Sequence, residues 1–440
     1  MAILTEQESK KIIDKVLSYS KADETSVIIN GGRIGNIRYA RNTISTTGET
    51  DDLSFEVTAV FGKKSGSASS NEFTEDAIRK TVKSAEEIAG FAPENPEYVS
   101  MLGPQQYQPS HTWAKDASAI TPGFRADAAL SSMKPCIDKN LVAAGYLEDT
   151  VGFTAMGNSK GLFGYNKETS ISFSVTVRTK DERGSGLGTQ YITEASMLNT
   201  KAATEIAMQK AIASADTIEM PTGKYTVILE PYALGSQSFI NFFMQSLDAR
   251  NADEGRSFFS KKGGGTKVGE KLFNEQLTIQ SDPLNPLVPA APFLADGRPT
   301  EKTTWVENGV LKNLFFTRYW AQNKGVKAIS PPSNVIISGS NQSLEELIKS
   351  SDKTILITAT HYMRMVDPQR ILITGLTRNG LFYIENGVIK HAVKNFRFNE
   401  SPINMFNNLE ALGKPIRINN SLIPPMKVKD FTFTSISDAV

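Results

Sequence analysis

The chain has 440 residues, with 48 Lys and Arg against 47 Asp and Glu, so its formal net charge is +1. Because neither sign is in excess, composition gives no electrostatic case for a nucleic-acid partner or for binding to an acidic membrane. With 40% hydrophobic, 9% aromatic and 22% charged residues the chain is ordinary globular protein, which excludes disordered and fibrous classes. Its length makes two or three domains the expectation.

Several features predict a cytoplasmic location. No apolar stretch approaches the roughly 18 residues that cross a bilayer. The N-terminal segment carries acidic residues where a signal peptide has its apolar core. The single cysteine, Cys136, forbids an intrachain disulfide and agrees with a reducing compartment. We therefore expect no membrane and no nucleic-acid partner.

The histidines argue against a zinc site within this chain. They are His111, His361 and His391, so no two lie three to five residues apart, and neither HExxH, HExxxH nor CxxC occurs. Zinc needs three or four converging nitrogen, sulfur or oxygen ligands. We therefore predict no metal and no other cofactor in this chain, although a carboxylate site for magnesium or calcium stays open.

Caps and apolar spacing predict six helices. They lie over residues 5–20, 74–90, 124–144 and 199–214, in a short segment after Ser343, and between Ser401 and Gly413. Thr5 to Glu8 form a capping box. Pro135 removes a hydrogen bond from the third helix and predicts a kink or a break there.

Between the helices the apolar period changes to two, and hairpin turns connect the strands, which predicts an α+β fold with antiparallel sheets. Residues 53–58 and 171–176 are closely similar strands. Each is expected to turn through glycines, the second through Gly184, Gly186 and Gly188, and to lead into a helix. This predicts a repeated hairpin-helix unit, while the alternative that amphipathic strands simply look alike stays open.

Two domains are predicted, an α+β domain over 1–220 and a mostly antiparallel β domain over 221–440. Five prolines make 92–123 a long crossing segment within the first. The second contains twin Asn-Gly turns at Asn308 and Asn386, which predict hairpins. An aromatic stripe over 234–247 has helical spacing and indicates core.

Motifs for phosphate binding and serine catalysis are incomplete. The glycine run 264–269 begins like a phosphate loop, but Glu270 stands where lysine is required. Gly235 lacks the second glycine of a G-x-S-x-G elbow. The lysine- and glycine-rich segment 261–267 is expected to be a mobile loop, and it could order on assembly or close over a ligand.

A polar run over residues 364–380 suggests a peptide-binding surface. Arginine forks can hold carboxylates or peptide carbonyls, and structural ion pairing at a sheet edge is the alternative. The candidates for a peptide channel are Arg364, Asp367, Arg370, Thr377, Arg378 and Asn379.

The order and spacing of several short motifs resemble the TldD/PmbA family, also called TldD/TldE and once named modulators of DNA gyrase. The resemblance covers nearly the whole chain. The motifs are Gly66-Ser67-Ala68, Asn158-Ser159-Lys160-Gly161, residues 221–225, 265–271 with 279–283, 364–368, 384–387 and 395–398.

The resemblance implies a two-domain chain that dimerises, with one zinc peptidase subunit and a similar subunit without zinc. In the zinc subunit, HExxxH on a helix and a late cysteine bind the metal. Here the matching segment 234–242 has neither His nor Glu, and no cysteine follows Cys136. The chain is therefore most similar to the zinc-free TldE/PmbA type.

The expected function is that of a non-catalytic subunit of a zinc metallopeptidase, forming part of a channel for peptides or small unfolded proteins that add as a strand to a sheet edge. The expected partner is a TldD-like zinc-binding homologue, which would hold the zinc, or a second copy of the chain. The alternative is a stand-alone homodimeric binding or regulatory protein. A metal-independent hydrolase is a third interpretation.

Overall fold

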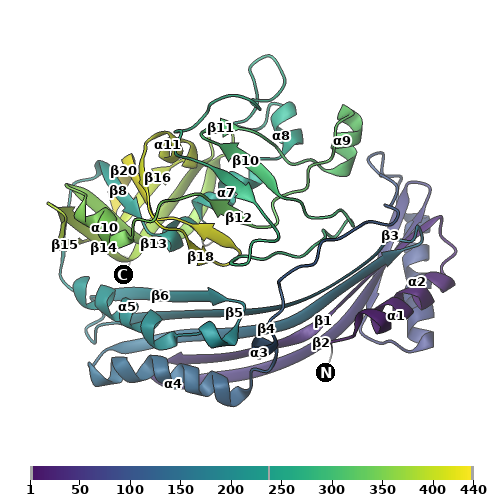
Figure 1. Cartoon of the computed structure of the whole chain (residues 1–440), viewed down its shortest axis with the longest axis horizontal. Helices are drawn as coiled ribbons and strands as arrows, with labels where there is room; N and C mark the ends of the chain where they lie inside the picture. The colour runs from purple at the N-terminus through teal and green to yellow at the C-terminus, as the bar shows by residue number, and fades with distance from the viewer. Residues whose placement is uncertain (1–2, 236–237, 438–440) are drawn as a thin grey trace.

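The computed structural model describes residues 3–235 and 238–437, whose strands form three sheets (Figure 1). The first sheet is long, curved and antiparallel throughout, in the order β3-β2-β1-β4-β5-β6. Its strands are β1 (Glu24–Ala40), β2 (Thr43–Phe61), β3 (Lys64–Ser70), β4 (Val142–Asn158), β5 (Phe163–Arg178) and β6 (Ser185–Ile192). The predicted α+β class with antiparallel sheets is confirmed.

Helices cover one face of this sheet at both ends. They are α1 (Glu6–Tyr19), α2 (Glu75–Phe91), α4 (Pro122–Asp138) and α5 (Thr200–Ala213), with the short α3 (Lys115–Ser118) and η1 (Ala195–Met197). On β5, Ile171, Phe173 and Val175 alternate with polar residues and pack in one core with residues of α4 and α5. The predicted capping box of Thr5 and the cap of Thr74 are both present.

The third helix is shorter than predicted. Residues 124–144 were expected to be helical, but α4 ends at Asp138 and β4 begins at Val142. Pro135 neither breaks nor ends the helix, because it lies in the last turn. Asn140, with φ of 59°, turns the chain into the sheet.

Both ends of the sheet contain the predicted hairpin-helix unit, β2–β3–α2 and β5–β6–α5. Gly186 and Gly188, however, lie within β6 and not in its turn. Their role is close packing: a Cβ at Gly186 would lie 2.1 Å from the backbone oxygen of Ala207 on α5, and one at Gly66 on β3 would lie 2.5 Å from that of Ala85 on α2. Glycine therefore lets each helix approach its strand.

Strand β2 has a free outer edge over its first half. Within the described residues, 43–54 pair with β1 alone, since β3 begins its pairing at Phe55. This stretch is largely exposed and carries Glu49, Asp51 and Asp52.

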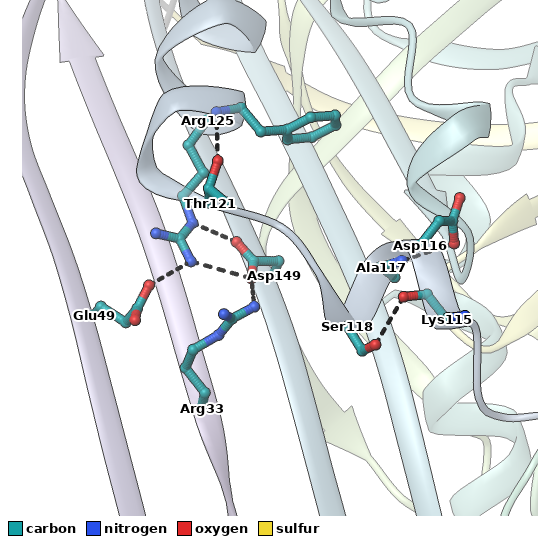
Figure 2. Close-up of polar contacts among 10 residues, drawn as sticks. Arg33, Glu49, Lys115, Asp116, Ala117, Ser118, Thr121, Arg125 and Asp149 are labelled. Carbon is teal, nitrogen blue, oxygen red and sulfur yellow. Dashed lines mark hydrogen bonds and ion pairs between the residues drawn. The ribbon is translucent and has the colours of Figure 1, made fainter. Parts of the chain in front are cut away.

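A buried ion network joins three strands to α4 (Figure 2). Arg125 and Asp149 are each 1% exposed, and the Arg125 Nε lies 2.5 Å from Asp149 Oδ1. A second guanidinium nitrogen of Arg125 contacts Glu49 at 2.9 Å, and Arg33 contacts Asp149 at 3.3 Å. Arg125 occupies the space above Gly35, where a Cβ would lie 1.7 Å from its Nη2.

The second half contains a closed five-stranded barrel in which β13 pairs with both β8 and β14. The barrel strands are β8 (Gly223–Leu229), β20 (Met426–Ile436), β16 (Phe396–Glu400), β14 (Leu372–Glu385) and β13 (Thr354–Asp367), extended by β7 (Thr217–Ile218), β15 (Val388–Val393) and β17 (Leu409–Leu412). Pairing is mostly antiparallel, as predicted, but β13–β8 and β15–β7 are parallel.

A third sheet has the order β11-β10-β9-β12-β19-β18. Its strands are β9 (Ile279–Ser281), β10 (Thr303–Glu307), β11 (Val310–Leu311), β12 (Val335–Ile337), β18 (Ile416–Ile418) and β19 (Ser421–Ile423). The helices of this half are α6 (Pro231–Gly235), α7 (Phe239–Gln245), α8 (Ala249–Asp253), α9 (Arg318–Lys324), α10 (Leu344–Lys349) and α11 (Pro402–Asn407). Both Asn-Gly hairpins are confirmed, with φ positive at Asn308 and Asn386.

Two further predictions concern the last helix and the segment 261–267. The helix expected up to Gly413 ends at Asn407, because Leu409 and Leu412 are buried on β17 against β20. Segment 261–267 is closed by backbone hydrogen bonds from Lys261 N to Gly265 O (2.9 Å) and from Lys267 N to Phe259 O (2.8 Å). Whether it orders on assembly stays a prediction.

The crossing segment is fastened to the start of β1 by Glu24. The Glu24 carboxylate accepts hydrogen bonds from the Tyr98 hydroxyl (2.6 Å), the Ser100 hydroxyl (2.5 Å) and the Met101 amide (2.7 Å), and it pairs with Lys160 at 2.8 Å.

The first sheet uses residues 24–192 and the other two use residues 217–436. The two-domain division itself stays a prediction.

Candidate functional site

A crevice lined by both polar and apolar residues lies between the first sheet and the second half of the chain. It consists of two adjoining hollows, of about 290 and about 370 Å³, which share Asn419 and Asn420. These two residues form the turn between β18 and β19, with Asn419 at φ of 53°. We call the two hollows together the central crevice. In Figure 1, β18 lies above β6 and β5, on the side of the second half that faces the first sheet.

The first hollow is lined from both halves of the chain. The sheet contributes Glu168, Ser170 and Ser172 from β5, on the face opposite Ile171 and Phe173, and other residues from β6 and the crossing segment. The second half contributes Arg417 together with the shared asparagines. Because alternate residues of a strand point to opposite faces, the sequence that buries the apolar side of β5 also presents its hydroxyls and Glu168 to the crevice.

The two charged side chains of this hollow, Arg417 and Glu168, differ in their contacts. Arg417 is fixed by two bonds, from Nη1 to Thr193 Oγ1 (2.7 Å) and from Nε to the Asn419 carbonyl (2.9 Å). Burial lowers the pKa of Arg417 and raises that of Glu168. The Glu168 side chain is nevertheless exposed to solvent within the crevice.

The second hollow lies beside α7. The aromatic stripe is core as predicted, with Phe239 and Phe243 fully buried. Asn241 and Gln245, four residues apart, line the hollow instead. Their amides, with those of Asn419 and Asn420, give it donors and acceptors without a formal charge. Of the segment 234–242, Ser236 and Gln237 lie outside the described residues.

The candidates at the tip of the β13–β14 hairpin do not belong to the crevice. Arg364 is exposed on β13, and its guanidinium lies 5.1 Å from the ring centroid of Tyr362. Asp367 accepts a hydrogen bond from the Gln369 amide within the turn, at 2.9 Å. The Arg370 carbonyl accepts one from Ser401, at 2.6 Å.

The other three candidates lie farther along β14. Thr377 is fully buried and bonds to Asn395 at 2.9 Å, which is a structural role. Asn379, with φ of 59°, accepts a hydrogen bond from Ser185 of the first sheet at 2.9 Å. Arg378 is half-buried, and its charge adds to burial in lowering the pKa of His361. The six candidates do not converge, and a peptide-binding role for them stays a prediction.

Sequence reasoning missed Glu168, Arg417 and the asparagine turn. The Asn419-Asn420 pair between two apolar strands is a turn signal that could have been found. Nothing in the sequence distinguishes Glu168 from other exposed acids, because its position depends on how the two halves come together.

Among residues 3–235 and 238–437, no three His, Cys, Asp or Glu side chains are grouped so that they could hold a metal ion. None of the helices in these ranges is both long and apolar enough to span a bilayer.

Three family models match the chain. They are the PmbA/TldA metallopeptidase domain 1 over residues 25–89, the central domain over 117–215 and the C-terminal domain over 222–435. The metalloprotease PmbA of Escherichia coli O157:H7 is 20% identical over 463 aligned residues, covering 97% of this chain and 98% of that protein. An uncharacterized protein of Methanocaldococcus jannaschii is 25% identical, covering 80% of this chain and 84% of its own.

Solved structures show the same fold. TldE from Thermococcus kodakarensis superimposes with a TM-score of 0.85 at 18% identity, covering 97% of this chain and 99% of its own. A Thermotoga maritima protein described as a modulator of a DNA gyrase gives a TM-score of 0.86 at 18% identity, covering 97% of this chain and all of its own.

Proposed function

This chain belongs to the PmbA/TldD metallopeptidase family, and from that premise we propose that it is the zinc-free subunit of a cytoplasmic zinc metallopeptidase that degrades or processes peptides and small unfolded proteins. The observation that carries the proposal is the sequence of this chain within its family: HExxxH is missing from all 440 residues, and the only cysteine is Cys136. Hydrolysis by a zinc peptidase requires a metal-activated water and a general base. A partner subunit with HExxxH supplies both.

The central crevice is the part of this chain that we assign to peptide binding. An extended peptide presents a carbonyl and an amide at every residue, and side-chain amides such as Asn241 and Gln245 pair with both without selecting a side chain. Serine and threonine hydroxyls in the first hollow add further donors and acceptors. Such a lining suits substrates of varied sequence.

Co-purification tests the proposal. The tagged full-length chain is expressed with a zinc-binding homologue that contains HExxxH, and the native mass, zinc content and peptidase activity of the captured material are measured. We expect a complex of the two chains whose zinc lies in the homologue and whose activity is removed by a chelator and restored by zinc.

The controls separate the alternatives. Homodimers of this chain that never associate with the homologue would instead support the stand-alone binding or regulatory protein. Peptidase activity of the pure chain that survives a chelator would contradict both and support a metal-independent hydrolase. Tightly held stoichiometric zinc in the pure chain would refute the assignment as the zinc-free subunit.

A further inference from the structure

Two opposite charges line the first hollow of the central crevice without pairing with each other. Glu168 comes from β5 and Arg417 from β18, so the two halves of the chain each contribute one. Within the described residues, neither Glu168 nor Arg417 forms a salt bridge within 4.0 Å, so the two do not pair with each other. The Glu168 carboxylate has no hydrogen-bond partner among these residues either, and burial alone accounts for its raised pKa.

Arg417 uses only some of its hydrogen-bond donors within the chain. A guanidinium carries five N–H groups in a planar fork, and the bonds to Thr193 and to the Asn419 carbonyl use two of them. These two bonds fix the plane of the group, so the remaining donors are held in place before any ligand arrives. This preorganisation lowers the entropy that binding must overcome.

Among the described residues, the half-buried Arg417 has no carboxylate partner that would explain its position structurally. Buried or partly buried charges in proteins are ordinarily paired, because their desolvation is costly. One ion pair that joins the two halves follows that rule: Lys210 and Glu230 lie 2.6 Å apart, and both are largely buried. A solvent-exposed carboxylate on one wall and a half-buried, fixed guanidinium on the other, neither neutralised by the other, are complementary to a ligand that carries both signs.

We propose that the first hollow binds the amino-terminal end of a peptide, with the Glu168 carboxylate accepting hydrogen bonds from the terminal ammonium and the Arg417 guanidinium donating to a carbonyl or terminal carboxylate oxygen of the same peptide. This rests on the proposed function, and it makes the site selective for free chain ends over internal segments. The volume of about 290 Å³ accommodates only a short piece of chain. The adjoining hollow of about 370 Å³ then receives the residues that follow, past the Asn419–Asn420 turn.

The test is a binding cycle on the full chain. Binding of tetra-alanine with free ends is measured by titration calorimetry, beside its N-acetylated and C-amidated forms, for the wild type and for Glu168→Gln. The substitution keeps the shape of the side chain and removes its charge. Glu194→Gln is the matched control, because Glu194 is an exposed acid near the crevice but not part of its lining.

We expect N-acetylation and Glu168→Gln each to weaken binding by about tenfold, as for one charge-assisted hydrogen bond. The two effects should not add, so that the acetylated peptide binds both proteins equally, and Glu194→Gln should behave as the wild type. Loss of affinity on C-amidation would assign Arg417 to the terminal carboxylate, and unchanged affinity would assign it to a carbonyl; each agrees with the proposal.

The proposal is overturned if the acetylated and free peptides bind the wild type equally, if Glu168→Gln has no effect, or if the effects of acetylation and substitution add. If the free and the acetylated peptide bound the wild type and Glu168→Gln with one affinity, this subunit would still bind peptides, but Glu168 would have no role in that binding. Absence of binding by every peptide would also overturn it, whereas co-purification with the zinc-bearing homologue decides the proposed function separately.

Discussion

The buried network around Arg125 gives the sharpest stability prediction. Arg125→Met removes the guanidinium and keeps much of the apolar volume, so Asp149, 1% exposed, loses two contacts and keeps only Arg33 at 3.3 Å (Figure 2). Removing one partner from a buried pair costs about 3–5 kcal/mol, because the other charge stays buried without compensation. Since Arg33 still neutralises part of the charge, we expect a loss near the lower end, about 3 kcal/mol.

Urea denaturation followed by circular dichroism measures this loss, with Arg79→Met as the matched control. Arg79 makes a comparably short ion pair with Glu75, 2.7 Å, but both side chains are about half exposed. Because solvent screens this pair, we expect its removal to cost much less than that of Arg125. Gly35→Ala is an independent test, because its Cβ would displace Arg125 while every charge is retained. If Arg125→Met cost no more than Arg79→Met, burial would not make this network important for stability.

Three further predictions concern stability. Glu24→Gln should lower the free energy of unfolding at pH 7 by about 2 kcal/mol; burial opposes the charged form of Glu24, but its hydrogen bonds lower its pKa to about 2. This stabilisation is present above the unfolded pKa of about 4.3 and is lost as the pH falls toward the folded pKa of about 2. The free energies of unfolding of wild type and variant should therefore converge in acid. A difference that stays constant with pH would contradict the reasoning. Gly186→Ala should destabilise the chain by about 1–3 kcal/mol in urea titrations, because its Cβ meets the Ala207 backbone. Gly90→Ala, on a helix with open space around it, should instead stabilise by about 0.5–1 kcal/mol, and equal effects of the two alanines would refute the close-packing argument.

The sequence was most informative where structure is local. The capping box at Thr5, the helix that begins after Ser343 and the Asn-Gly turn at Asn308 appear where predicted, because each depends on a few neighbouring residues. Predictions failed where tertiary packing decided the outcome. The glycines of β6 were assigned to a turn, although their small size serves the approach of α5, a contact between residues about twenty positions apart.

The central crevice could not be predicted for the same reason. Glu168 and Arg417 are separated by most of the chain and meet only because β18 lies over β5 and β6. Sequence motifs are defined by spacing along the chain, whereas this site depends on the docking of two halves. The polar run on the β13–β14 hairpin, which does stand out in the sequence, is spread over a turn, an exposed strand and a buried threonine.

The free outer edge of β2 has a consequence for how the protein behaves at high concentration. An unpaired strand offers its amides and carbonyls to any other strand, including the same edge of a second molecule. Asp51 and Asp52 place two exposed carboxylates along that edge, beside Glu49, which pairs with Arg125. Two such edges therefore repel each other before their backbones can form hydrogen bonds. We expect replacement of Asp51 and Asp52 by asparagine to favour association of the protein through this edge.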